Sequence, residues 1–169
     1  IEQEQADFDA SGAKIQAVRS VHLRLLKDLF ALLSPSHLKA EVATLAKQLK
    51  SPGIKLGVRR AYDGTFNRLR EDLARADEMA GEIQSMLEGS FKNLNAEYGF
   101  SLQAPSSPQL ALYRRDLDLI EKSHLQYLSL GNALRLAQPE FAERLARALM
   151  SRLRVVYETA VNEVELWNK

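Results

Sequence analysis

The apolar residues of this chain recur mostly every three, four or seven positions, which is the spacing of a helix face rather than of a strand. In the first 34 residues, two rows with a seven-residue repeat lie three positions apart. Such rows form one narrow seam against a neighbouring helix, and an occasional polar residue on the seam is tolerated. The rows are Phe8, Ile15, His22 and Leu29, and Ser11, Val18, Leu25 and Leu32.

Proline and glycine divide the rest of the chain into further helices. A capping residue followed by proline is a helix start signal, because proline fits the first helical position and its missing N–H is not needed there. A glycine after the last periodic residue predicts a left-handed helix end. Helical periodicity fades between residues 125 and 137, and two alternatives stay open for this stretch, an extended crossover and a poorly formed helix turn. The start signals are Ser34-Pro35, Ser107-Pro108 and Gln138-Pro139, and Gly99 is the expected helix end.

These segments predict an all-α fold, an elongated antiparallel bundle with four long helices and one short helix. Residues 1–169 are expected to form a single domain, because this length supports one core. Glycines inside the helix expected over residues 58–98 weaken it and allow a kink. Both chain ends lack capping residues, so we expect a segment of a longer polypeptide. An even number of long antiparallel helices would bring both ends to the same end of the bundle, as a stalk requires.

Composition excludes several classes of protein. Hydrophobic residues make up 46% and charged residues 27% of the chain, which is ordinary for a helix-rich soluble protein. No apolar run has the length of a membrane span, and the absence of cysteine removes disulfides and thiolate chemistry. Glycine-rich nucleotide-binding motifs are also absent. We therefore expect no enzymatic activity, catalytic residue, cofactor or metal in this segment, and a cytoplasmic location, with peripheral contact to the inner membrane as an option.

One pair of residues has metal-ligand spacing. Glu121 and His124 lie one helical turn apart, as do ligands in di-iron bundles, but such bundles need the pair twice with further carboxylates. Neither His22 nor His37 has an acid three positions before it. We therefore interpret Glu121 and His124 as an ordinary surface pair. A ferritin-like metalloenzyme is kept as an alternative.

The loop between the second and third expected helices is the candidate contact site. It places two aliphatic side chains among four cations, a composition suited to inserting into a lipid interface whose head groups are anionic. The alternative is a solvent loop whose aliphatic residues fold back onto the bundle. No recognition helix accompanies these cations, so we expect no nucleic-acid partner. The candidate membrane or partner contacts are Lys50, Ile54, Lys55, Leu56, Arg59 and Arg60.

Charge is unevenly distributed although the net charge is only +1. Residues 36–60 carry six Lys and Arg and one Glu, whereas residues 61–100 carry four basic and eight acidic side chains. Such polarity can steer a protein toward an anionic surface or a complementary copy of itself. The alternative is a set of solvated helix faces.

Several dispersed motifs carry a family resemblance. They are Glu4-Gln5-Ala6-Asp7-Phe8, Ile15-Gln16, Arg19-Ser20-Val21, Arg59-Arg60, Glu97-Tyr98-Gly99-Phe100 and Glu163-Val164-Glu165-Leu166-Trp167. In this order they resemble the helical region that follows the GTPase domain in bacterial dynamin-like large GTPases. The resemblance implies a helical stalk that self-associates, contacts the GTPase domain of the same parent chain and supports membrane remodelling. It carries no nucleotide-binding residue onto this segment. The alternative function is a helical sensory or ligand-binding domain of a receptor.

Overall fold

The computed structural model describes residues 1–49, 57–129 and 138–168, and these contain helices and irregular segments but no strand. The all-α expectation is therefore confirmed for this part of the chain. No helix in it is long and apolar enough to cross a membrane. The elements are α1 (Glu2–Leu32), α2 (Pro35–Leu49), α3 (Val58–Tyr98), the 3-10 helix η2 (Leu110–Tyr113), α4 (Arg114–Ser129) and α5 (Pro139–Asn168).

The lengths of these helices correct the predicted count. Three are long, with 31 residues in α1, 41 in α3 and 30 in α5. Two are short, because α2 has 15 residues and α4 has only 16. The prediction of four long helices and one short helix is therefore wrong for α4. The segment after Leu125 has weak periodicity but is helical as far as Ser129. Residues 130–137 lie outside the described part.

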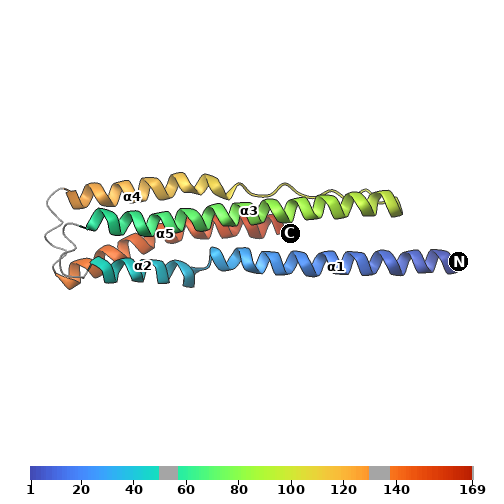
Figure 1. The fold of residues 1–169 in the computed structure, drawn as a ribbon, viewed down its shortest axis with the longest axis horizontal. Helices are drawn as coiled ribbons and strands as arrows, with labels where there is room; N and C mark the ends of the chain where they lie inside the picture. Colours follow the sequence, from blue (N-terminus) through green and yellow to red (C-terminus); the bar gives the residue numbers. More distant parts are fainter. Residues whose placement is uncertain (50–56, 130–137, 169) are drawn as a thin grey trace.

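α4 begins later than the Ser107-Pro108 signal predicts. Residues 101–109 have no regular secondary structure and run back along α3 (Figure 1). The backbone N–H of Ser107 donates to Gln84 Oε1 of α3 at 2.8 Å. The N–H of Ala111 in η2 donates to Asp77 Oδ1 of α3 at 3.2 Å. A neighbouring helix thus supplies the cap that Ser107 was expected to provide, and α4 begins only after η2.

The other helix-end signals are confirmed. The Ser34 hydroxyl accepts a hydrogen bond from the His37 N–H at 3.1 Å, and α2 begins at Pro35. Gly99 has a left-handed φ of 72°, and its N–H donates to the Asn95 carbonyl at 2.9 Å. Because only glycine adopts this φ without cost, α3 ends where the sequence places glycine.

The chain reverses direction along one long axis. Figure 1 shows α1 and α2 running one after the other, α3 returning beside them, α4 running back and α5 returning again. α1 packs mainly against α3, and α2 packs mainly against α5. The N-terminal half of α1 and the C-terminal end of α3 extend past the end of α5 (Figure 1). The two described chain ends therefore do not meet at one end of the molecule, in contrast to the expectation.

The core follows an apolar stripe along α3. This stripe is buried from Val58 to Leu94, whereas of the seam residues of α1 only Ser11 and Leu29 are buried. Leu29 is completely buried, but Phe8 is 73% and Ile15 is 44% exposed. The other core residues of α3 are Tyr62, Phe66, Leu69, Leu73, Ala76, Met79, Ala80, Ile83 and Leu87.

Candidate functional site

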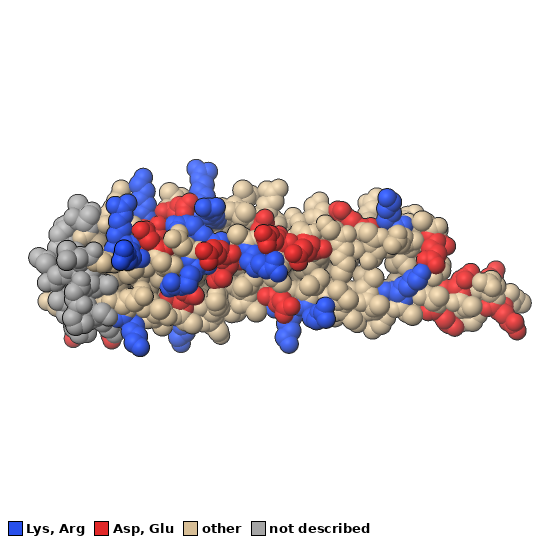
Figure 2. Space-filling view, viewed as in Figure 1, with Lys and Arg blue, Asp and Glu red and all other residues tan. Residues whose placement is uncertain are grey.

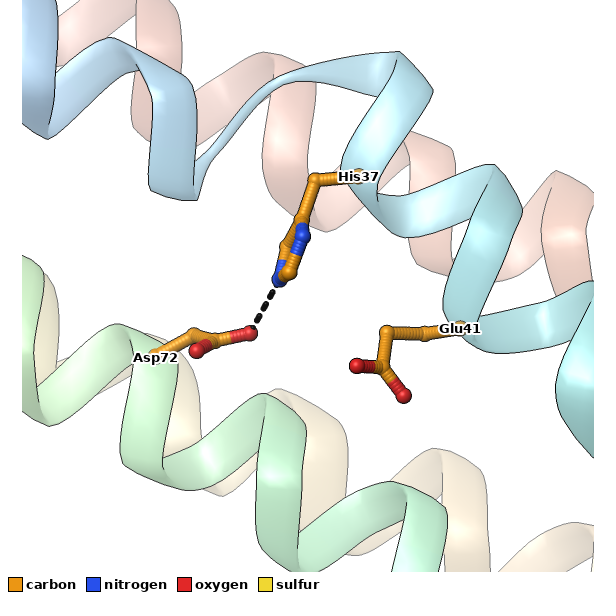
Figure 3. Close-up of side chains that lie close together, drawn as sticks. All are labelled: His37, Glu41 and Asp72. Carbon is orange, nitrogen blue, oxygen red and sulfur yellow. Dashed lines mark hydrogen bonds and ion pairs between the residues drawn. The ribbon is translucent and has the colours of Figure 1, made fainter.

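Three side chains with metal-ligand chemistry meet between α2 and α3. His37 and Glu41 lie one turn apart on α2, and Asp72 projects toward them from α3 (Figure 3). His37 Nε2 lies 2.6 Å from Asp72 Oδ2. One donor atom from each of the three residues lies within 4.8 Å of the others. These residues are called the α2–α3 polar cluster below.

Local structure fixes the position of each member of the cluster. The Ser34 cap holds the first turn of α2, from which His37 projects. The four-residue spacing places Glu41 on the same helix face. Asp72 precedes the fully buried Leu73, so it lies at the edge of the α3 core stripe. The cluster is consequently half-buried, with its side chains 18–35% exposed.

Two further residues border the cluster. Arg68 of α3 donates through Nε to Glu41 Oε2 at 2.8 Å and partly neutralises that carboxylate. Tyr157 of α5 is only 2% exposed, and its hydroxyl has no hydrogen-bond partner among the described residues. Burial raises the pKa of Tyr157, and the negative charges of Asp72 and Glu41 raise it further. The phenol is therefore neutral and close enough to these carboxylates to be affected by their charge.

The arrangement supports two kinds of chemistry. An imidazole nitrogen and two carboxylates are a donor set that binds divalent transition metals. Without a metal, the same groups form a hydrogen-bonded link between α2 and α3. Nothing in the sequence analysis identified this cluster. The His37–Glu41 spacing was visible in the sequence, but Asp72 lies 31 positions after Glu41 and shares no pattern with it.

The predicted contact loop lies mostly outside the described residues. Lys50, Ile54, Lys55 and Leu56 belong to the segment 50–56 that the structure does not describe, so their role stays a prediction. Arg59 and Arg60 are described. Both are exposed in the first turn of α3. This helix also carries Asp72, but the two arginines are not part of the α2–α3 polar cluster.

The Glu121–His124 pair is not the surface pair that was expected. His124 is only 6% exposed, and its ring lies 6.2 Å from that of Tyr62 in α3. Glu121 Oε1 accepts a hydrogen bond from Arg70 Nη2 at 2.7 Å, while Arg70 Nε donates to Asp118. Glu121 thus forms an ion pair with Arg70, and His124 packs in the core. The Arg70–Glu121 ion pair joins α3 to α4.

A pocket of about 390 Å³ lies between α4 and α5 beside His124. Arg152 of α5 borders it and donates to the Ser123 hydroxyl at 3.1 Å. Burial, together with the charge of Arg152, lowers the pKa of His124 to about 4, so the imidazole is neutral near pH 7. The pocket therefore combines positive charge with apolar walls. Its lining residues are Ser123, His124, Tyr127, Phe141, Arg144, Leu145, Ala148 and Arg152.

Comparison with protein-family models, with curated proteins and with solved structures gave no match. The resemblance to dynamin-like GTPases thus rests on its quoted motifs alone and stays a prediction. The expected lack of enzymatic activity and of cofactors is likewise untested. Function has to be inferred from the geometry of the chain itself.

Proposed function

We propose that this chain is the helical stalk and assembly region of a dynamin-like GTPase. In this role it self-associates, passes on rearrangements of the GTPase domain of the same parent chain and supports membrane remodelling. It has no catalysis of its own. The proposal combines the family resemblance of the sequence with one structural observation, which is an uncovered apolar face on the extended half of α1.

That face continues the line along which α1 meets α5. His22 Nε2 lies 2.9 Å from Asn168 Oδ1, and the His22 and Trp167 ring centroids are 6.4 Å apart. Ile15 and Phe8 precede His22 by one and two heptads, so they lie on nearly the same face of α1. Among the described residues no other helix covers them, and Phe8 is 73% and Ile15 is 44% exposed. The face of α1 that contacts α5 at His22 is thus uncovered at Ile15 and Phe8.

A groove beside this face provides room for a partner. It lies between α1 and α3, has a volume of about 570 Å³, and its lining includes the small residues Ala17, Ser90 and Ala96. The Lys14–Glu97 ion pair, with a distance of 2.5 Å, spans the two helices at its edge. Small residues let another helix approach closely. The lining residues are Lys14, Ala17, Val18, Ser90, Asn93, Leu94, Ala96 and Glu97.

Charge favours a second copy of this chain as the occupant. Figure 2 shows acidic side chains gathered at the N-terminal tip of α1. They come from Glu2, Glu4, Asp7 and Asp9, and the first basic residue after them is Lys14. Arg59 and Arg60 lie at the start of α3, which is the opposite end of that helix from the tip (Figure 1). Opposite charges at opposite ends favour head-to-tail contacts, which can extend into an assembly.

Sedimentation velocity over a range of protein and salt concentrations tests this proposal. We expect self-association at low salt that weakens at high salt, because exposed charges are screened. The double variant Phe8→Ser, Ile15→Ser should be monomeric, whereas Leu119→Ser, which removes an apolar residue with 59% exposure on α4, should associate like the wild type. A wild-type chain that stays monomeric at high concentration and low salt contradicts the proposal.

An anionic membrane is the second proposed partner, through the loop residues named above. The double variant Ile54→Asp, Leu56→Asp should no longer co-sediment with anionic liposomes, because it places two negative charges among the cations. Liposomes of uncharged lipid are the control. Absence of wild-type co-sedimentation with anionic liposomes would remove the membrane from the proposal and leave self-association intact.

A ligand-binding domain is the alternative function, and the α4–α5 pocket favours it. Arg144 and Arg152 suit a small carboxylate, and the aromatic side chains beside them suit a flat apolar body. Calorimetric titration with benzoate is the test. Saturable binding that Arg144→Gln weakens would support this alternative, and a flat titration would argue against it.

A further inference from the structure

The donor atoms of the α2–α3 polar cluster are close to the spacing that a small metal ion requires. Zinc–nitrogen and zinc–oxygen bonds are about 2.0–2.2 Å, so two ligands of a tetrahedral ion lie about 3.3 Å apart. His37 and Asp72 are in contact at 2.6 Å, and all three donor atoms lie within 4.8 Å of each other. Binding therefore needs side-chain shifts of only about 1 Å, with no movement of the helices.

We propose that His37, Glu41 and Asp72 form a binding site for a divalent transition-metal ion of the zinc class. One imidazole with two carboxylates favours zinc and its neighbours over magnesium or calcium, which prefer oxygen ligands alone. Three protein ligands leave one position of a tetrahedral ion for water. The site would be a binding site, and no reaction is assigned to it.

A second observation points to the same place. The Tyr157 hydroxyl is buried, has no hydrogen-bond partner among the described residues, and is close enough to Asp72 and Glu41 for their negative charges to add to the rise in pKa that burial causes. A buried hydroxyl without a partner destabilises the fold, so native proteins usually provide one. A metal ion with its bound water, or a carboxylate reoriented by the metal, supplies that partner. α5 thereby becomes the third helix that contributes to the site.

Arg68 acts as an internal competitor for the ion. Its guanidinium holds Glu41 Oε2 at 2.8 Å and leaves the other carboxylate oxygen for the metal. Removing this positive charge frees the carboxylate and lowers the repulsion of an incoming cation. Loss of Arg68 should therefore strengthen metal binding, in contrast to loss of any ligand.

Metal binding would have a structural consequence. His37 and Glu41 occupy the first turns of α2, directly after the break between α1 and α2 at Ser34. An ion held by both α2 and α3 fixes this corner on the long helix. The expected result is a protein whose melting temperature rises with zinc concentration, as for any ligand that binds only the folded state.

Isothermal titration of tag-free, chelator-treated protein with zinc chloride tests the proposal. We expect one ion per chain, with binding at least about tenfold weaker in His37→Ala and in Asp72→Asn. Arg68→Gln should bind several-fold more tightly. His22→Ala is the matched control, because His22 lies outside the cluster and should leave the affinity unchanged. Magnesium chloride should give no comparable heat.

A second measurement on the wild type avoids dependence on how well the variants fold. Paramagnetic Co²⁺ broadens the ring signals of a ligating histidine in proton NMR, and this chain has only three histidines. Selective broadening of His37 supports the site. Absence of zinc binding, binding that His37→Ala leaves unchanged, or broadening of His22 or His124 alone overturns the proposal. Self-association can fail without affecting this result, because the cluster lies apart from the extended half of α1.

Discussion

At the scale of single residues, the buried polar groups show where the fold is sensitive. Arg70 and Glu121 are both well buried, with side chains 15% and 13% exposed, and they join α3 to α4. Arg75, by contrast, pairs with Glu78 and Glu82 on the surface of α3, where all three side chains are more than half exposed. The two arginines offer a matched comparison of a buried and a solvated ion pair.

Arg70→Met should destabilise the protein by about 2–4 kcal/mol, because it leaves the Glu121 carboxylate buried without its cation. Arg75→Met should cost less than about 0.5 kcal/mol, because exposed pairs contribute little. Urea unfolding of both variants at neutral pH provides the measurement. Adding Glu121→Met to Arg70→Met should recover much of the loss. Equal effects of the two arginine substitutions would contradict the importance given to the α3–α4 pair.

His124 should make the stability of the fold depend on pH. Burial, aided by the charge of Arg152, lowers its pKa from the ordinary value of 6.5 to about 4. Between these values the unfolded chain binds more protons than the folded chain, so stability present above about pH 6.5 is lost as the pH falls toward 4. After allowance for solvent screening, we expect a loss of roughly 1–2 kcal/mol.

The variant His124→Phe separates this effect from other titrations. Its stability should change less than that of the wild type between pH 7 and pH 5, because it lacks the buried imidazole that binds a proton less readily in the folded chain than in the unfolded chain. Chemical unfolding at several pH values measures the difference. Parallel curves for wild type and variant would show that His124 does not carry the pH dependence.

At the scale of elements, the sequence predicts helix ends where the signal is local. Pro35, Gly99 and Pro139 act through their own backbone geometry, and each marks a helix boundary in the structure. The start of α4 depends instead on Asp77, a side chain of α3 that no local pattern connects with Ala111. Non-local hydrogen bonds of this kind explain why boundaries are harder to predict than helices.

The same distinction applies to the candidate site. The spacing of His37 and Glu41 reveals that they share a helix face, but only packing of α2 on α3 brings Asp72 to them. Tyr157 of α5, whose pKa is raised by burial and by the charges of Asp72 and Glu41, is likewise far away in sequence. The ligand pattern of di-iron bundles places an acid three positions before a histidine, so it does not reveal Glu41, which lies four positions after His37.

Two glycines, Gly89 inside α3 and Gly99 directly after it, test how much backbone conformation contributes to the stability of this helix. Gly89 lies exposed inside the helix, and an added Cβ would meet no atom within 4 Å. Gly89→Ala should therefore stabilise the protein by about 0.5–1 kcal/mol, through better helix propensity. Gly99→Ala should destabilise it by about 1 kcal/mol, because alanine disfavours the φ of 72°. Thermal unfolding distinguishes the two, and shifts of the same sign would contradict this assignment.

At the scale of the whole molecule, support for the helices is uneven along the long axis. The described part of the chain has α2, α3, α4 and α5 side by side over one portion, whereas the N-terminal half of α1 packs mainly on α3 (Figure 1). A helix with a single neighbour buries less apolar surface, and packing provides most of the stability of a helix. Local opening should therefore be easiest in residues 2–17.

Hydrogen exchange followed by mass spectrometry measures this gradient. In dilute protein, peptides from residues 2–17 should exchange faster than those from residues 22–32, because α5 contacts α1 at His22 and α1 is most buried toward its C-terminal end, at Leu26 and Leu29. In concentrated protein at low salt, self-association through the uncovered face should slow exchange in residues 2–17 selectively. The variant Phe8→Ser, Ile15→Ser should lack this concentration dependence. Slower exchange only in other segments would place the self-contact elsewhere, since a protected interface has to include the residues that form it.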